Sequence, residues 1–382
     1  MQLARSNPQH MSLMSKLARI NWVMVLLLCM IAAIGFVLLY STAGGRFDPW
    51  ASRQMTRFAF GLVIFLVAAS IDIRFWLRYA YLFYFLAFVL LGSVEFIGAG
   101  AYGARRWMEF GGVRVQPSEI MKVALVLALA RYFHRTALED AVRPLYLIVP
   151  LLLMAAPAAL VLRQPDLGTA MMLILVAGGV FFLSGVRVWK FVAIGVAGLA
   201  AIPIVWSKLH TYQQQRVLTF LNPDSDPLGA GYHILQSQIA LGSGGIFGKG
   251  FLKGTQAHLN FLPEQQTDFI FTILAEEFGI VGGLLLLTLY GALIIYGMSV
   301  ALRSRNQFGK ILAMGVILNF FLYVFINMAM VMGLIPVVGV PLPLVSYGGT
   351  AMLTLMFGFG LLMSVHVHRD VQISRHDPNE PV

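Results

Sequence analysis

The chain has 382 residues, of which 59% are hydrophobic and 12% charged. Soluble globular proteins carry about 25% charged residues, so this composition excludes an ordinary soluble enzyme. The single cysteine, Cys29, lies in an apolar run, which excludes a disulfide framework and a Cys-ligated metal site. The net charge of +10 comes from basic residues flanking apolar runs. This pattern indicates membrane topology, and we expect a lipid bilayer around the chain and no nucleic-acid partner.

Apolar runs recur along almost the whole chain, and a membrane-spanning helix needs about 20 such residues. The second run is short, and the eighth is longer than one span requires. The sequence therefore predicts an all-α integral membrane protein, a single polytopic domain over 1–382 with about ten transmembrane helices. The expected spans are 21–41, 57–71, 75–94, 118–134, 145–162, 167–184, 189–206, 269–299, 311–333 and 345–365.

The loop charges predict the orientation of these spans. Short loops that hold many lysines and arginines stay on the cytoplasmic side, and that condition is met best with the N-terminus inside. We therefore expect a cytoplasmic N-terminal segment (1–20), a large periplasmic loop between helices seven and eight (207–267) and a cytoplasmic tail (369–382). Most acidic residues then fall on the outer face, which is where we expect the polar chemistry.

The glycine-rich run GSGGIFGKG, from Gly242 to Gly250, has some likeness to a phosphate-binding loop. The residue after Lys249 is Gly250, however, so the magnesium-binding hydroxyl of that motif is missing. We expect a flexible glycine loop here.

The stretch LPEQQTDFIFTILAEEFG, from Leu262 to Gly279, is the most informative polar segment. If a helix begins near Thr267, then Asp268, Thr272 and Glu276 follow at intervals of four residues and form one polar stripe. Such a stripe on an apolar helix indicates a water-filled cavity. The alternative is that Thr267 or Asp268 only caps the helix.

A second polar group precedes the fourth span, where QPSEIMK places Glu119 and Lys122 one helical turn apart. The two residues could form a simple salt bridge or part of a functional site. Arg106, in the preceding outer loop, could bind a phosphate through its guanidinium group or could only be solvated. The last outer loop, from Gly333 to Thr350, contains three prolines and four glycines, so it should be irregular and packed against protein.

These motifs together resemble the SEDS (shape, elongation, division, sporulation) family of peptidoglycan glycosyltransferases over nearly the whole chain. Within that family, the sequence resembles the branch that serves cell elongation more than the division branch. The resemblance rests on GARRWMEFGG (Gly103 to Gly112) with QPSEIMK, QPDLGTA (Gln164 to Ala170), GTQAHLNFLPEQQTDFIFTILAEEFG (Gly254 to Gly279) and PLPLVSYGGT (Pro341 to Thr350).

The resemblance implies a ten-helix fold that polymerises lipid II on the outer face of the bacterial inner membrane. It also implies a class B penicillin-binding transpeptidase and other elongation-complex membrane proteins as partners. It places the essential acid at Asp268. The residues expected to bind substrate are Arg106, Glu119, Lys122, Asp166, Arg216, Glu264, Thr267, Glu276 and Ser346.

The sequence departs from the family at Gln265 and Gln266, where many relatives have a basic residue followed by His. A histidine at this place is therefore not required for proton transfer in this chain.

A β-1,4 link made from an α-linked lipid diphosphate inverts the anomeric centre in one displacement. We expect Asp268 to be the base for the acceptor hydroxyl, and Arg106 and Lys122 to offset the charge of the departing diphosphate. The sequence leaves the metal requirement unknown, although Mg²⁺ or Mn²⁺ could share that task.

Two other functions fit the composition. One is a flippase or transporter of a lipid-linked cell-wall precursor, and the other is a scaffold that only activates the transpeptidase. Transporters usually place ionisable groups near the membrane midplane. The acids of this chain gather at one interface instead, which favours chemistry at that interface.

Overall fold

The computed structural model describes residues 12–97, 99–101, 104–110, 113–136, 143–208, 211–222, 230–255 and 264–373. The described chain is mainly helical. Its helices are α1 Leu13–Ala18, α2 Trp22–Thr42, α3 Ala51–Ser70, α4 Ile73–Ile97, α5 Pro117–Arg135, α6 Pro144–Arg163, α7 Leu167–Leu183, α8 Val188–Lys208, α9 Thr211–Leu221, α10 Ala230–Ser243, α12 Ile270–Arg303, α13 Gln307–Val331 and α14 Gly349–Val367. Its strands are β1 Ala99–Ala101, β2 Ala104–Phe110 and β3 Val113–Val115.

Ten of the helices in the described part of the chain have 17 or more residues, and they correspond one to one to the ten expected spans. Seven are both long and apolar enough to cross a membrane, whereas α7 and the first part of α8 are shorter apolar helices. Helix α5, which is not among these seven, has the length of a span but carries the charged residues Glu119, Lys122 and Arg131. The predicted all-α, multi-span architecture is confirmed.

The helix boundaries differ from the predicted spans at two functionally relevant ends. Helix α3 begins at Ala51 rather than at 57. The prediction began too late because the first two turns carry the polar residues Arg53, Gln54 and Arg57, which lower the hydropathy there. Helix α14 begins at Gly349 rather than at 345, because the residues before it belong to the irregular outer loop. Hydropathy alone misses both ends, since it follows the apolar residues and not the backbone.

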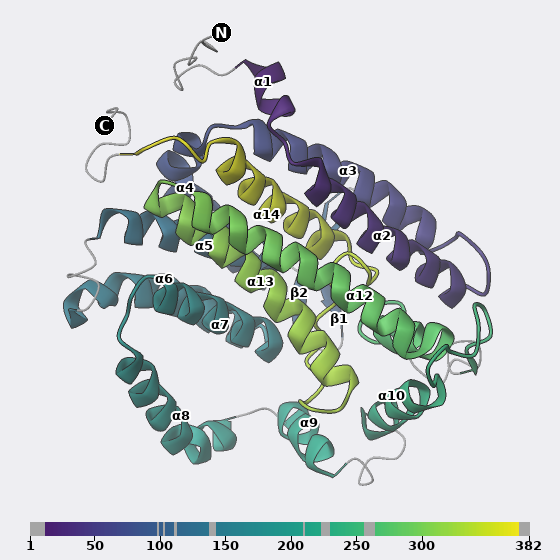
Figure 1. The fold of residues 1–382 in the computed structure, drawn as a ribbon. Helices are drawn as coiled ribbons and strands as arrows, with labels where there is room; N and C mark the ends of the chain where they lie inside the picture. Colours follow the sequence, from purple (N-terminus) through teal and green to yellow (C-terminus); the bar gives the residue numbers. More distant parts are fainter. Residues whose placement is uncertain are drawn as a thin grey trace.

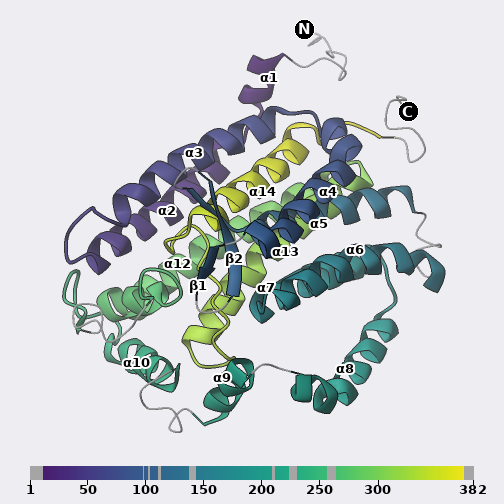
Figure 2. The ribbon, with the colours of Figure 1, turned by 180° about the vertical axis from the view of Figure 1, so that it is seen from behind.

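A three-stranded antiparallel sheet between α4 and α5 was not predicted. Its strands follow one another in the order β1-β2-β3, and Met108 pairs with Val115 across the second ladder. The sheet packs against α4, α5 and α14 (Figure 2). Strands this short leave little periodicity in a glycine-rich sequence, which explains why hydropathy does not reveal them.

Helix α13 lies at the centre of the bundle, with α12 and α14 packed on it together with α5 and α7 (Figure 1). Most of its side chains are buried, as expected for a helix that is apolar on all sides. This central position matters for function, because α13 carries two polar residues, Tyr323 and Asn327, toward the outer end of the molecule.

Helices α8, α9 and α10 form an arc along one edge of the bundle in both ribbon views (Figures 1 and 2). Helix α8 is the least covered of the long helices, and side chains such as Val196 and Leu199 are mostly exposed. In a bilayer, hydrocarbon would cover these side chains.

The segments predicted to share the cytoplasmic side lie together at one end of the bundle. Lys16 Nζ donates to the Ser70 carbonyl at 2.9 Å, which ties α1 to the α3–α4 turn. Arg305 N donates to the Arg369 carbonyl at 3.1 Å, which ties the α12–α13 turn to the segment after α14. These bonds show that the loops lie at the same end of the bundle, as spans of alternating direction require.

Candidate active site

The turn that carries Asp268 lies just before α12, not within it. Helix α12 begins at Ile270, and the Asp268 amide donates to the Glu264 carbonyl at 3.1 Å in the preceding turn. The predicted helix start near Thr267 is therefore wrong, and Asp268 does not belong to a continuous polar stripe. The N-cap residue of α12 is Phe269, which makes no side-chain cap bond, and the Thr267 hydroxyl bonds to Glu264 instead, so Thr267 does not cap the helix.

The last outer loop binds this turn from one side. Ser346 Oγ donates to the Thr267 carbonyl at 2.5 Å and accepts a bond from the Leu342 amide at 2.7 Å. The Tyr347 amide donates to the Gln266 carbonyl at 2.8 Å. Ser346 is buried and its hydroxyl is engaged with backbone, so in this structure it positions the two loops. That it binds substrate stays a prediction.

Asn327 of α13 binds the turn from beneath. Its side-chain nitrogen donates to the Asp268 carbonyl at 3.0 Å and to the Val340 carbonyl at 2.7 Å. Asp268 itself is only partly buried. A methyl group at the exposed Gly339 would lie 3.4 Å from Asp268 Oδ2. A glycine here therefore leaves room beside the carboxylate, and the turn holds Asp268 at an accessible surface by its backbone.

Glu119 and Lys122 form a buried ion pair deeper in the bundle. Lys122 Nζ lies 2.7 Å from Glu119 Oε1, and the two residues are 2% and 4% exposed. The Tyr323 hydroxyl donates to Glu119 Oε2 and also contacts Lys122 Nζ. Tyr323 precedes Asn327 by one turn of α13. The ion pair of Glu119 and Lys122 therefore lies about 6 Å further along the helix axis than the hydrogen bond from Asn327 to the Asp268 carbonyl.

The ion pair is electrically neutral as a unit and does not reach the surface of this structure. A buried charge that lost its partner would strongly destabilise the fold, because it could not be solvated. We therefore interpret Glu119 and Lys122 as a support for the outer end of α5 and α13. Their predicted contact with substrate stays a prediction.

Arg106 and Asp166 meet at the turn between α6 and α7. Asp166 is the N-cap of α7 and accepts bonds from the Thr169 amide at 3.2 Å and the Thr169 hydroxyl at 2.9 Å. Arg106 Nε lies 3.9 Å from Asp166 Oδ2, and the guanidinium donates to the carbonyls of Gln164 and Pro165. The Arg106 side chain remains 28% exposed. It therefore ties β2 to this turn and keeps part of its positive charge at the surface.

Glu276 is completely buried at 0% exposure. Its Oε1 accepts bonds from Lys249 Nζ at 2.6 Å, from the Thr255 amide at 2.9 Å and from the Thr255 hydroxyl at 2.9 Å. The adjacent Glu277 accepts a bond from the Ser41 hydroxyl of α2. Glu276 has no exposed surface from which to contact a substrate in this structure, so we interpret it as a residue that holds the glycine loop.

That loop, 244–250, fills a break in α12, so the expectation of a flexible loop was wrong. Gly279 adopts φ 65°, which interrupts the helix and frees backbone groups on both sides of the break. The loop supplies partners for these groups, as buried backbone requires. The four bonds join Ile280 N to Gly245 O (3.0 Å), Val281 N to Ile246 O (3.1 Å), Lys249 N to Glu276 O (2.9 Å) and Gly250 N to Glu277 O (3.0 Å).

The remaining predicted residues lie in the large loop. Glu264 is exposed and accepts a bond from the Thr267 hydroxyl at 2.9 Å, which places both residues beside Asp268. Arg216 belongs to α9, but its side chain lies outside the described residues. Residues 209–210, 223–229 and 256–263 of this loop lie wholly outside the described residues.

Sequence reasoning missed the residues that hold the site in place. Asn327 and Tyr323 are polar residues within an apolar helix, and that signal could have identified them. Gln54 of α3 donates to the Ser346 carbonyl at 2.8 Å, and the Thr350 hydroxyl accepts from the Gln116 amide at 3.1 Å. Both are links between distant segments that no local pattern reveals.

Within the described residues, no group of three or more His, Cys, Asp or Glu side chains is placed to hold a metal ion. Magnesium in phosphate chemistry usually takes one or two carboxylates, together with water and substrate oxygens. A divalent cation at Asp268 would therefore depend on a bound diphosphate for several of its ligands.

Comparison with known proteins identifies the family. The family model FTSW_RODA_SPOVE, described as "Cell cycle protein", matches residues 20–371. The chain is 47% identical over 348 residues to the peptidoglycan glycosyltransferase MrdB of Escherichia coli (strain K12), covering 91% of this chain and 93% of that protein.

Two solved structures are also similar. One is a chain in the structure described as "Structural coordination of polymerization and crosslinking by a peptidoglycan synthase complex", at 32% identity, with a TM-score of 0.79 and coverage of 92% of this chain and 98% of that chain. The other is the rod shape determining protein RodA of Thermus thermophilus, at 28% identity, with a TM-score of 0.69 and coverage of 92% and 97%. The chain is a multi-pass membrane protein that belongs to the FtsW/RodA/SpoVE, or SEDS, family.

Proposed function

We propose that this chain is a peptidoglycan glycosyltransferase that polymerises lipid II into glycan strands for cell elongation, with Asp268 as its base. One observation carries the assignment of the base. Asp268 is a partly exposed carboxylate at the end of the bundle, and its turn is held by backbone bonds from α13 and from the last outer loop. A general base must be held in position and must be accessible to the hydroxyl from which it takes the proton.

The reaction is a single displacement at the anomeric carbon of the donor sugar. Asp268 takes the proton from the acceptor 4-hydroxyl as the oxygen attacks that carbon. The bond from the carbon to the phosphate oxygen breaks, and the lipid diphosphate leaves. The anomeric centre is inverted, and no covalent intermediate with the enzyme is required.

Positive charge near the departing diphosphate would stabilise the transition state. Arg106 is the best placed of the predicted cations, because its guanidinium keeps an exposed part while its other edge is held by carbonyls. Lys122 is buried in a neutral pair, so it supports the site from within the bundle. A bound divalent cation would supply further positive charge to the same oxygens.

From the loop charges we infer that this site lies on the periplasmic side of the bacterial inner membrane, with both termini in the cytoplasm. The similar chain in a peptidoglycan synthase complex supports a partner that crosslinks the product. We infer a class B penicillin-binding transpeptidase as that partner, together with other membrane proteins of the elongation complex.

The test is reconstitution of the purified chain with its transpeptidase partner in vesicles that contain lipid II. We expect glycan polymer on gels, and removal of divalent cations by a chelator tests whether a metal takes part. A flippase would instead move fluorescent lipid II between leaflets without forming polymer. A scaffold would do neither, and either result would overturn the proposal.

A further inference from the structure

The outer end of α3 carries two arginines, Arg53 and Arg57, one helical turn apart. Arg53 is exposed and Arg57 is partly exposed, and α3 contains no acidic residue. Two positive charges at this spacing share one face of the helix and repel each other. An anion bound beside them would relieve that repulsion.

The Arg57 side chain is not held by hydrogen bonds. Its Nη1 is buried and has no partner, and within the described residues no carboxylate lies within 4.0 Å of its guanidinium nitrogens. The nearby acids bind elsewhere, since Asp48 accepts a bond from Ser52 at 2.5 Å and Glu109 from Arg114 at 2.6 Å. A charged donor that is left unsatisfied is costly. The guanidinium can therefore turn toward an anion without losing a hydrogen bond.

The guanidinium is placed by an aromatic ring and by a glycine. Its central carbon lies over the Tyr347 ring, 4.6 Å from the centroid. A methyl group at Gly349 would lie 3.2 Å from Arg57 Nε, so the group packs against the start of α14. Stacking covers the face of a guanidinium and leaves its N–H edges available. Those edges match pairs of phosphate oxygens.

Tyr347 also joins Arg57 to the turn that carries Asp268. The Tyr347 amide donates to the Gln266 carbonyl at 2.8 Å. Gln266 is two residues before Asp268, a separation of at most about 7 Å along the chain. One residue of the last outer loop therefore contacts both the guanidinium and the turn of the proposed base.

The proposed displacement needs a base and a cation on opposite sides of the anomeric carbon, because the attacking oxygen and the leaving oxygen are in line. Asp268 is placed for the attacking side. Arg57 is set apart from the Asp268 turn by Tyr347, as a cation for the leaving side must be. Arg106 already donates to two backbone carbonyls, whereas Arg57 has no such bond to give up.

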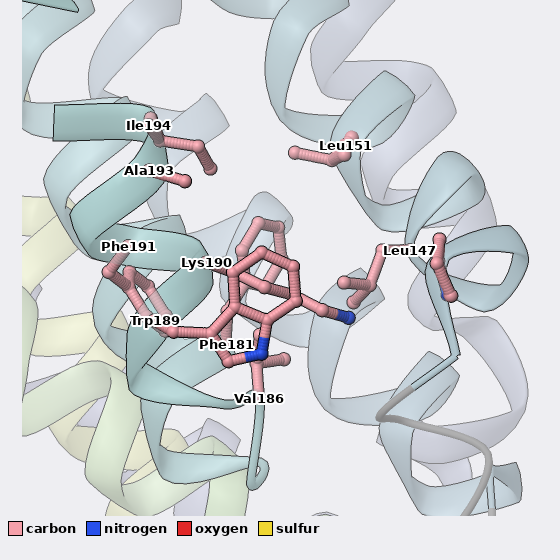
Figure 3. A pocket seen from close by; sticks show the side chains of 10 residues that line it. Leu147, Leu151, Phe181, Val186, Trp189, Lys190, Phe191, Ala193 and Ile194 are labelled. Carbon is pink, nitrogen blue, oxygen red and sulfur yellow. The ribbon is translucent and has the colours of Figure 1, made fainter. Parts of the chain in front are cut away.

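The pocket between α6, α7 and α8 does not offer an alternative site for a diphosphate (Figure 3). It includes Phe181 and Val186 at the end of α7, whereas Asp166 caps the start of that helix. Its volume is about 310 Å³, and nine of its ten lining residues are apolar. An apolar lining does not compensate the lost hydration of a diphosphate, so the outer end of α3 is the better site.

We propose that Arg57 binds the diphosphate of the lipid-linked donor, across the anomeric carbon from Asp268. This inference rests on the proposed function, since it names the residue that holds the leaving group of that reaction. When the bond from the anomeric carbon to the phosphate oxygen breaks, the diphosphate leaves with the electron pair. Arg57 donates to its oxygens and offsets the added charge, and Arg53 contributes positive charge one turn away.

Native mass spectrometry of the full chain in detergent measures this binding without the reaction, with farnesyl diphosphate and farnesyl monophosphate as the probes. The unmodified chain should bind the diphosphate more tightly. Arg57→Gln should weaken diphosphate binding about tenfold, as expected for one lost charge-assisted contact, and Arg57→Lys should weaken it less. Arg46→Gln is the matched control, because it removes an exposed arginine from the α2–α3 connection and should leave both affinities unchanged.

The variant is also compared for stability, because a purely structural arginine would affect folding instead of binding. The melting temperature of Arg57→Gln should stay close to that of the unmodified chain, since no hydrogen bond is lost. Unchanged diphosphate binding in Arg57→Gln would overturn the inference. Displacement of farnesyl diphosphate by dioleoylphosphatidylglycerol from the unmodified chain but not from Arg57→Gln would also overturn it, because the site would then bind phospholipid.

Polymer formation from lipid II separates this inference from the proposed function. We expect kcat/KM to fall about tenfold in Arg57→Gln and to stay unchanged in Arg46→Gln. If the unmodified chain forms polymer and Arg57→Gln keeps both its kcat/KM and its diphosphate affinity, the role of Arg57 is overturned and the proposed function stands. If the unmodified chain binds the diphosphate through Arg57 but forms no polymer, the diphosphate site stands and the proposed reaction is overturned.

Discussion

The turn at 264–268 and the break in α12 at Gly279 lie close together in sequence and both carry acidic residues, but they differ in structure. Asp268 is partly exposed, and its turn is held through backbone atoms. Glu276 is fully buried, and three donors converge on one of its carboxylate oxygens. The first arrangement leaves a carboxylate partly exposed at the surface, and the second uses a buried carboxylate to hold a loop. Spacing along one helix cannot separate these roles, but burial does.

The largest effect is expected at Asp268. Asp268→Asn keeps the size of the side chain but removes the base, so polymer formation from lipid II should fall by a factor of about 10² to 10⁴. The measurement is the initial rate of polymer formation with the transpeptidase partner present. Asp48→Asn is the matched control, because Asp48 lies in the exposed α2–α3 connection and its loss should leave the rate unchanged. A normal rate in Asp268→Asn would remove this residue from the mechanism.

The next effect concerns the break in α12. A methyl group at Gly248 would lie 2.1 Å from the Glu277 carbonyl oxygen, and Gly248 has φ +80°. Gly248→Ala should therefore destabilise the protein by about 3 kcal/mol, seen as a lower melting temperature in detergent. Gly242→Ala is the control, since nothing lies within 4 Å of the added methyl group. Equal melting temperatures for the two variants would mean that the loop does not fill the break.

A smaller effect is expected for the buried carboxylate itself. Glu276→Gln leaves the Lys249 ammonium without a charged partner, and we expect a loss of about 2 kcal/mol because that ammonium keeps some access to water. Lys249→Met combined with Glu276→Gln should be less destabilising than the sum of the two single changes, as a double-mutant cycle would show. Polymer formation per folded molecule should be unchanged. If it fell as far as in Asp268→Asn, Glu276 would belong to the chemistry.

The smallest effect is expected beneath the Asp268 turn. Asn327→Ala removes the donor to the Asp268 and Val340 carbonyls, so the carboxylate should be less well positioned and kcat should fall about tenfold. The measurement is kcat and KM, with melting temperature alongside. Asn319→Ala changes another buried asparagine of α13 and should lower the melting temperature without the fall in kcat. Equal kcat values for both variants would show that Asn327 has no positioning role.

Much of this architecture follows from the sequence. Runs of apolar residues predict the ten long helices, because each helix must satisfy its own backbone within the membrane. Hydropathy does not predict the structure where backbone N–H and C=O groups form hydrogen bonds with distant segments. The break at Gly279 depends on loop 244–250, and the start of α14 depends on bonds between its preceding loop and the turn before α12. The residue pattern around Glu276 carries no sign of these partners.

The candidate site shows the same division. The resemblance to a known family pointed to Asp268, and the structure places this residue at an accessible turn. The supporting residues Asn327 and Tyr323 were missed because their partners are 59 and 204 residues away in sequence. Local spacing predicted the pair of Glu119 with Lys122 correctly, since the two residues are one helical turn apart. It could not predict that the pair would be buried.

The most direct test measures polymer formation and melting temperature on the same preparations of Asp268→Asn and Glu276→Gln. The account predicts opposite outcomes, with Asp268→Asn inactive at an unchanged melting temperature and Glu276→Gln active per folded molecule at a lowered one. An active Asp268→Asn, or a Glu276→Gln that is inactive yet as stable as the unmodified chain, would contradict the separation of catalysis from structural support.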